Sequence, residues 1–177
     1  MITKALVMAM VLVESGGNPG AVSPAGAIDL MQMTSIAVKE VNQQYGITTQ
    51  PDLRDPYENL CYGILLLDYY FTTTGSIKGA LISYNGGGIQ LAHWRNKQPL
   101  TEETANYLPR VLANRARLNR MFDRELQPST GLQALVDDVF DDLYGVGEEG
   151  SDFLFTGGLR TLRDPSGANP VYCSIPL

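Results

Sequence analysis

Glu14 is the residue best placed by its surroundings to act as an acid. It directly follows residues 5–13, which are all apolar, so the sequence predicts a helix buried on every side. Burial and the negative end of a helix dipole both disfavour the carboxylate and raise the pKa of such a glutamate. Cleavage of a glycosidic bond needs an acid that is still protonated near neutral pH, because the leaving oxygen must receive a proton. Glu14 alone is a weak signal, since a glutamate at a helix end is most often simply solvated.

Short polar and glycine-rich motifs follow Glu14 in a fixed order. They are Glu14-Ser15-Gly16-Gly17-Asn18-Pro19, Ser23-Pro24-Ala25-Gly26-Ala27, Leu30-Met31-Gln32, Ser83-Tyr84-Asn85-Gly86-Gly87 and Glu103-Thr104-Ala105-Asn106-Tyr107. Over residues 5–118 this succession resembles the catalytic domain of the soluble lytic transglycosylases and the related goose-type lysozymes. Each motif alone occurs by chance, whereas the series is specific.

The resemblance implies a function for each matched residue. Glu14 corresponds to the family's catalytic glutamate. The matched residues that would bind or brace the glycan strand are Ser15, Ser23, Gln32, Tyr84, Asn85, Glu103 and Tyr107. Tyr84 and Asn85 would lie beside the scissile bond, and Tyr107 would face the catalytic carboxyl.

The chain departs from the family pattern at three points. Asp29 stands where the family usually has glycine before Leu-Met-Gln, which adds a side chain near the expected cleft floor. Ser83 replaces the usual alanine before Tyr-Asn. The sequence also begins almost at the catalytic helix, so part of the usual packing is expected to come from elsewhere. None of these changes removes a catalytic group.

The reaction is indicated by the lack of a second matched carboxylate. Most glycosidases use two catalytic carboxylates. In this sequence Asp29 and Glu103 are the only nearby candidates for a second carboxylate beside Glu14, and neither matches a second catalytic carboxylate. In the resembled family the substrate's acetamido group stabilises the anomeric carbon, and the glutamate acts first as acid and then as base on the muramyl 6-hydroxyl. The resemblance therefore implies a lytic transglycosylase that cleaves the MurNAc-GlcNAc β-1,4 bond of peptidoglycan and forms 1,6-anhydro-MurNAc. The alternatives are a hydrolytic lysozyme on the same scaffold and a catalytically silent structural virion protein.

No metal or cofactor is expected. One histidine, His93, and two distant cysteines make no zinc site, and the aspartates of residues 137–142 follow helical spacing and not that of a calcium loop. His93 and Trp94 could line a glycan groove or simply pack. Cys61 and Cys173 could pair, but Cys61 lies in an apolar helical pattern where a free buried thiol is commoner.

The hydrophobic pattern predicts an all-α protein. Helices are expected over residues 5–13, 30–45, 60–69, 77–83 and 109–125, followed by an amphipathic helix over 132–143 and an irregular tail. We place a boundary after residue 127. Residues 1–127 would form a lysozyme-like domain, and residues 128–177 a C-terminal helix and extended tail.

The charge and the termini suggest a cellular context. A net charge of −6 disfavours nucleic acid as a partner, and residues 5–13 are too short for a membrane span and do not resemble an export signal. We expect delivery within a larger assembly, with residues 131–177 docking on a protein partner. A bacteriophage virion acting in the bacterial periplasm is the preferred context, and a secretion apparatus is the alternative.

Overall fold

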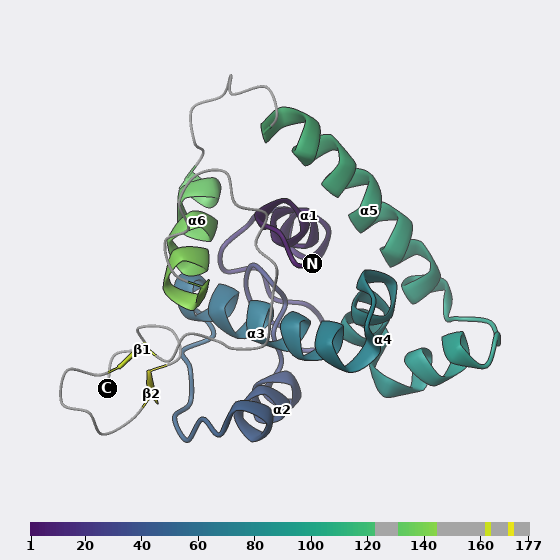
Figure 1. Cartoon of the computed structure of the whole chain (residues 1–177), viewed down its shortest axis with the longest axis horizontal. Coiled ribbons are helices and arrows are strands. Elements are labelled where there is room, and N and C mark those ends of the chain that lie inside the picture. Colours follow the sequence, from purple (N-terminus) through teal and green to yellow (C-terminus); the bar gives the residue numbers. More distant parts are fainter. Residues whose placement is uncertain (123–130, 145–161, 164–169, 172–177) are drawn as a thin grey trace.

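The computed structural model describes residues 1–122, 131–144, 162–163 and 170–171. Within these residues the elements are α1 (Lys4–Glu14), α2 (Ser35–Tyr45), α3 (Pro56–Thr74), α4 (Ile77–Arg95), α5 (Glu102–Phe122), α6 (Gly131–Tyr144) and the paired strands β1 (Leu162–Arg163) and β2 (Pro170–Val171). The expected all-α class is therefore confirmed (Figure 1). No helix in the described ranges has both the length and the hydrophobicity that crossing a bilayer requires.

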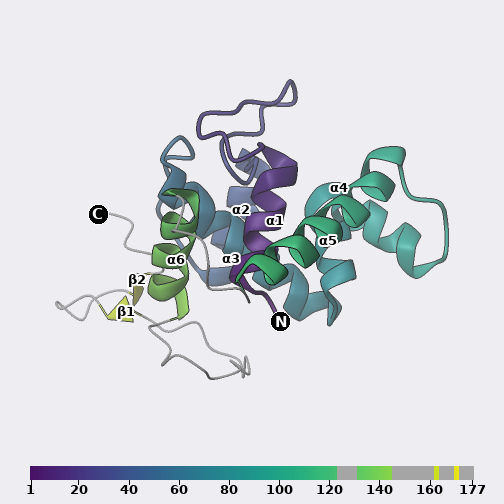
Figure 2. The same cartoon turned by 90° about the horizontal axis from the view of Figure 1, so that it is seen from above.

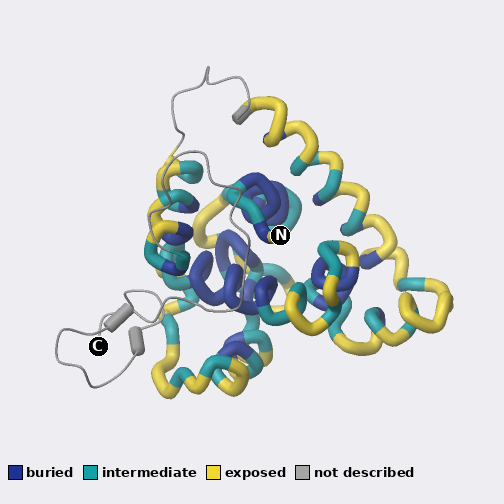
Figure 3. Tube along the Cα trace, viewed as in Figure 1, coloured by how far each residue is buried: buried dark blue, intermediate teal, exposed yellow. Residues whose placement is uncertain are grey.

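The central element is α1. It lies between α5 and α6, as two perpendicular views agree (Figures 1 and 2). The Thr3 hydroxyl caps its first turn by accepting a hydrogen bond from the Leu6 N–H at 3.2 Å. Residues 5–11 are all buried, and Figure 3 shows α1 and the middle of α3 as the buried centre of the fold. An apolar sequence on every face of a helix is thus explained by neighbours on every side.

The second helix begins later than the sequence predicts. Residues 30–33 form a turn instead, with a bridge between Ile28 and Met33, and α2 starts after Thr34, whose hydroxyl accepts from the Ala37 N–H. The backbone reason is the left-handed conformation of Asp29 (φ 63°) and Gln32 (φ 49°), which no α-helix tolerates. Leu30, Met31 and Met33 are buried by this turn, so their apolar pattern gave a misleading helical signal.

The third helix is longer than the predicted 60–69. It begins directly after Asp55, whose carboxylate accepts from the N–H groups of Tyr57 and Glu58 at 2.9 and 3.0 Å. Pro56 occupies the first helical position, where its missing N–H is not needed. The helix ends at Gly75, which has φ 66°.

The predicted limits of the next two helices are also wrong. The helix predicted over 77–83 continues as α4 to Arg95, with a kink at Gly87 (φ 66°, ψ −170°). The helix predicted to start at Pro109 starts at Glu102, and the proline lies inside it. Pro109 is exposed, so its ring points away from the core. Proline's preference for the first turn of a helix misled the sequence argument.

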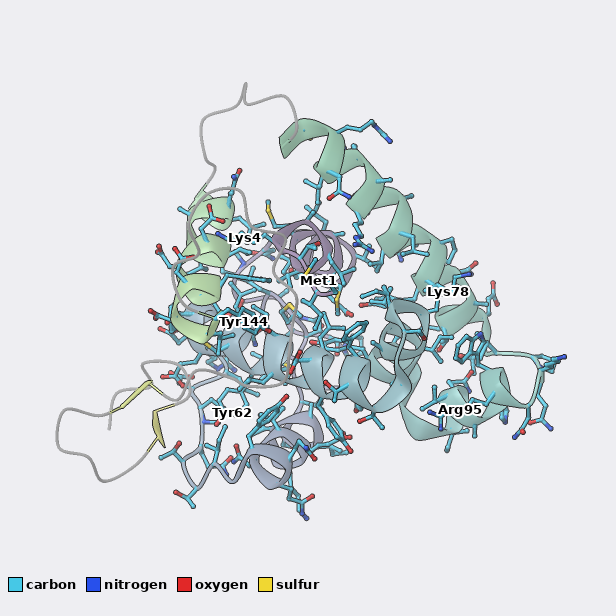
Figure 4. All side chains as sticks on the ribbon, in the orientation of Figure 1. Met1, Lys4, Tyr62, Lys78, Arg95 and Tyr144 are labelled. Carbon is cyan, nitrogen blue, oxygen red and sulfur yellow. The ribbon has the colours of Figure 1, made fainter. Side chains whose placement is uncertain are left out.

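The predicted amphipathic helix near the C-terminus is confirmed as α6. Its buried residues, Val136, Val139, Phe140 and Leu143, belong to the same core as α1 and α3. Lys4 forms an ion pair with Asp137 at 2.8 Å, and Figure 4 places the Lys4 side chain beside α6. The Tyr57 hydroxyl also donates to Asp142. Both apolar and polar contacts thus hold α6 to the first part of the chain.

Cys61 does not match the expected free thiol. It is fully buried in α3, as its apolar neighbours predict, but it is disulfide-bonded. An apolar helical pattern predicts that a cysteine is buried, but it does not distinguish a free thiol from a disulfide. The other cysteine of the sequence, Cys173, lies outside the described residues.

Candidate active site

Glu14 is the last residue of α1 and is only partly exposed. Burial raises the pKa of its carboxyl from 4.5 to about 7. A side-chain interaction with Tyr107 lowers that pKa, the charge of Glu103 raises it, and the charge of Arg110 lowers it. A carboxyl whose pKa lies near neutral pH suits a group that must both give and accept a proton.

Tyr107 faces Glu14 from α5. Its side chain is buried at 4% exposure, and burial together with the Glu14 charge raises its pKa well above the usual value. The phenol interacts with the Glu14 carboxyl, yet its oxygen has no partner of ordinary hydrogen-bond geometry among the described residues. The contact is therefore longer or less well aligned than a normal hydrogen bond.

Tyr84 approaches the same carboxyl from α4. Burial, and after it the Glu14 charge, raises the pKa of Tyr84. Its hydroxyl donates to the Met31 carbonyl oxygen at 2.9 Å and lies 3.4 Å from the Met33 sulfur. The structure thus brings Tyr84 close to Glu14, and the tyrosine also holds the turn that contains Gln32.

Ser15 and Gln32 stabilise the backbone around Glu14. The Ser15 hydroxyl lies within hydrogen-bond distance of the carbonyl oxygens of Val11 (3.1 Å) and Leu30 (3.0 Å). The Gln32 amide nitrogen donates to the carbonyls of Asp29 (2.8 Å) and Ala21 (3.3 Å). The Ser15–Leu30 bond joins the end of α1 to the 20–33 loop. The Gln32 bonds lie within that loop and leave Oε1 of Gln32 as the atom that can contact a ligand.

Asp29 does not point into a cleft. Its side chain is completely buried, and its Oδ1 accepts from the Leu30 N–H at 2.5 Å. Burial raises the pKa of this carboxyl. The expectation of a side chain on the cleft floor is therefore wrong, because at φ 63° the aspartate folds back on its own loop. Aspartate is one of the few residues other than glycine that accept this conformation. Ser83, the second departure, is also buried.

Asn85 is held by a residue that the sequence analysis did not single out. Thr104 is buried in α5 and donates its hydroxyl hydrogen to Oδ1 of Asn85 at 2.8 Å. This bond ties the end of the first half of α4 to α5, and it leaves the Asn85 Nδ2 group for other partners. Thr104 lies inside the Glu103-to-Tyr107 motif, so its position was a usable signal.

The remaining expected site residues have separate positions. Ser23 accepts a local bond from the Ala27 N–H at 3.0 Å, inside the loop closed by the Val22–Ile28 bridge. Glu103 is exposed on α5 and acts on Glu14 through its charge. His93 bonds through Nδ1 to the Pro99 carbonyl at 3.0 Å, and Trp94 is 37% exposed.

Asn59 and Arg110 are site residues that the sequence analysis missed. Asn59 is fully buried in α3; its Oδ1 accepts from the Met31 N–H at 2.9 Å, and its Nδ2 donates to the Ile28 carbonyl at 2.9 Å. It thus holds both sides of the turn that Tyr84 contacts. A lone asparagine inside an apolar helical pattern was the available signal. Arg110 is exposed on α5, one turn after Tyr107, and its charge lowers the pKa of Glu14.

Comparisons with known proteins place this arrangement in context. The family model described as "Transglycosylase SLT domain" matches residues 1–107. The chain is 30% identical over 167 residues to the transglycosylase of Enterobacteria phage PRD1, an alignment that covers 86% of this chain and 57% of that protein. It is 33% identical over 122 residues to the endo-type membrane-bound lytic murein transglycosylase A of Cronobacter sakazakii, covering 60% of this chain and 59% of the relative.

A solved structure is similar as well. The 70 kDa soluble lytic transglycosylase SLT70 of Escherichia coli superposes with a TM-score of 0.64 and 25% sequence identity, over 69% of this chain and 22% of that one. The chain spans less than two thirds of the length of the two curated relatives.

Proposed function

The chain belongs to the transglycosylase SLT domain family, and from this premise we propose that it is a peptidoglycan lytic transglycosylase with Glu14 as its only acid and base. The observation that carries the proposal is the position of Glu14, which ends the buried helix α1 and faces the buried Tyr107; burial there raises its pKa to about 7. Tyr84 and Tyr107 flank it from α4 and α5. The substrate would be the glycan strand of peptidoglycan.

The first step uses the protonated form of Glu14. The carboxyl donates its proton to the glycosidic oxygen as the bond between that oxygen and C1 of the muramyl residue breaks. The substrate's acetamido oxygen stabilises the positive charge that develops at C1, as the family resemblance implies. The Thr104 hydroxyl fixes the Asn85 side chain by donating to its Oδ1. The Nδ2 group of Asn85 therefore remains free to donate to the acetamido group and orient it.

The second step uses the carboxylate that remains. Glu14 removes the proton from the muramyl 6-hydroxyl, and O6 bonds to C1 to give the 1,6-anhydro sugar. No water is consumed, and Glu14 ends the cycle protonated. A pKa near the working pH suits both steps, since neither the acid nor the base form is then scarce.

The nearby carboxylates favour one catalytic glutamate. Asp29 is buried within its own loop and bonded to the Leu30 N–H, so it is not available to activate water. Glu103 is exposed and acts on Glu14 through its charge. The exposed carboxylate of Glu103 is the feature that favours the alternative function, a hydrolytic lysozyme in which Glu103 activates water.

Product analysis tests the proposed reaction. Purified peptidoglycan should yield 1,6-anhydro-muropeptides, which are lighter by one water than the reducing-end products of a hydrolase. Glu14→Gln should abolish release of either product, whereas the control Glu102→Gln, an exposed glutamate on α5, should retain activity. Reducing-end products from the unaltered protein would support the lysozyme. A folded protein that releases neither product would support the third alternative, a catalytically silent structural virion protein.

We also propose that the enzyme is virion-associated and acts on the cell wall from the bacterial periplasm, with a secretion apparatus as the alternative. The similarity to a phage PRD1 transglycosylase supports this context. In this proposal residues 1–127 carry the catalytic unit and residues 131–177 dock on a protein partner. The apolar face of α6 already packs on α1 and α3, so docking would use its acidic outer face or residues 145–177.

Particle incorporation tests this context. The full chain and a chain lacking residues 145–177, which keeps α6, would be compared in purified virions by immunoblot. Loss of the truncated chain from the particles, with its enzymatic activity retained, is expected. Equal incorporation would contradict docking through residues 145–177.

A further inference from the structure

Three residues of α5 form a row opposite Glu14. Glu103, Tyr107 and Arg110 are spaced by four and three residues, so they lie on one face of the helix. All three interact electrostatically with Glu14. Tyr107 is buried in the middle, while Glu103 and Arg110 are exposed on either side of it. The charged residues Glu103 and Arg110 are about 10 Å apart along the helix axis.

Among residues 1–122 and 131–144, no carboxylate forms an ion pair with the guanidinium of Arg110. In the described part of the chain both ion pairs are made by Lys4, with Asp137 and Asp141. Glu103 is the charged residue on the same row, yet it forms no ion pair with Arg110. The N–H donors of this exposed arginine are therefore available on the face of α5 that carries Tyr107, within the range at which its charge acts on the Glu14 carboxyl.

A carboxylate is the ligand group that best fits the guanidinium of Arg110. Its planar arrangement of N–H groups matches a carboxylate, with which it forms two parallel hydrogen bonds. A peptidoglycan strand carries such groups on one of its two alternating sugars, because muramyl residues bear a lactyl ether and a peptide stem that ends in free carboxylates. An uncharged aminosugar polymer carries none.

We propose that Arg110 is a specificity-determining residue that binds a carboxylate of the muramyl substituent next to the bond that Glu14 protonates. This inference rests on the proposed function. Carboxylate binding would place the muramyl residue, and not its neighbour, beside Glu14, so it would fix which of the two alternating glycosidic bonds is cleaved. It would also distinguish peptide-bearing strands from neutral glycans.

The test compares Arg110→Gln with the matched control Arg117→Gln, an exposed arginine two turns further along α5. Substrates are soluble peptidoglycan strands with their peptide stems, and the same strands after conversion of the free carboxylates to methylamides. Assays at about pH 5.5 keep Glu14 mainly protonated in every variant while the stem carboxylates stay ionised. This choice separates binding from any change in the acidity of Glu14.

Arg110→Gln should raise KM about tenfold on the native strands with kcat little changed, and Arg117→Gln should change neither. On methylamidated strands the Arg110→Gln and unaltered proteins should have the same KM. An unchanged KM for Arg110→Gln on native strands, or the same increase on methylamidated strands, would overturn the inference. Binding of native strands to Glu14→Gln with and without Arg110→Gln measures the same contact without turnover, so it remains informative even if the proposed reaction is wrong.

Discussion

The Tyr107 phenol on α5 and the Glu14 carboxyl on α1 face each other inside the fold, and the tyrosine oxygen has no other partner in the described structure. Tyr107 is almost completely buried, so this polar group is retained in the core without a bond of ordinary geometry. A buried hydroxyl in that state costs stability. In the proposed reaction this hydroxyl would donate to Glu14 whenever the carboxyl is ionised, which would account for its retention at this position.

Tyr107→Phe should therefore separate activity from stability. Loss of the hydroxyl removes an interaction that lowers the pKa of Glu14, and kcat should fall about 10- to 100-fold because the carboxylate formed in the first step loses its donor. The free energy of unfolding should stay equal or rise slightly, since an unsatisfied polar group is removed. Steady-state kinetics and thermal unfolding measure the two quantities; a large loss of stability would contradict this assignment.

Glu14→Gln should change how stability depends on pH. The folded-state pKa of Glu14 is raised from 4.5 to about 7, so between these values the native state binds more protons than the unfolded chain. The stability associated with protonated Glu14 is complete below pH 4.5 and is lost as the pH rises through 7. The variant cannot ionise and should be more stable than the unaltered protein above pH 7, by on the order of 2–3 kcal/mol.

Denaturant unfolding of both proteins from pH 4 to 8 measures this difference. Asp29 and Asp68 also have raised pKa values caused mainly by burial, but they are present in both proteins and cancel. A constant stability difference across the pH range would show that Glu14 titrates normally.

The two charged neighbours of Tyr107 should shift the pH profile in opposite directions. The charge of Glu103 raises the pKa of Glu14 and that of Arg110 lowers it; Tyr107 on α5 and Tyr84 on α4 are the other groups that face the carboxyl. The alkaline limb of kcat/KM reports the acid form of Glu14. It should move to lower pH in Glu103→Gln and to higher pH in Arg110→Gln. Shifts of the same sign would contradict the electrostatic arrangement.

The sequence predicted which segments lie near Glu14 better than it predicted where the surrounding helices begin and end. The all-apolar run before Glu14 and the ordered motifs pointed to segments that the structure brings together around Glu14, because burial and local turns leave direct traces in residue type. The start of α5 was misplaced by Pro109, whose ring is tolerated inside the helix at an exposed position. The start of α2 was misplaced because Asp29 and Gln32 adopt positive φ. Their residue types allow this conformation but do not predict it.

Contacts between distant segments could not be read from the sequence at all. Asn59 reaches the Ile28–Met31 turn from α3, and Thr104 reaches Asn85 from α5. Each bond depends on how segments far apart in the sequence pack together, which local periodicity does not specify. Ser15 and Gln32 were expected to contact substrate. The hydrogen bonds that they form with backbone carbonyls were not predicted from the sequence.

Gly86 is the position where packing between α4 and α5 leaves no room for a side chain. A Cβ atom there would lie 2.3 Å from Cγ of Gln90 and 2.7 Å from Oγ1 of Thr104, whereas one at Gly88 would meet nothing within 4 Å. Gly86→Ala should therefore push Thr104 away from Asn85, cost on the order of 1–3 kcal/mol of stability and lower kcat. Gly88→Ala adds the same methyl group to the same helix and should be neutral or slightly stabilising. Thermal unfolding and turnover of the two variants test this directly, because similar effects at both positions would mean that helix propensity, and not the Asn85–Thr104 contact, determines the outcome.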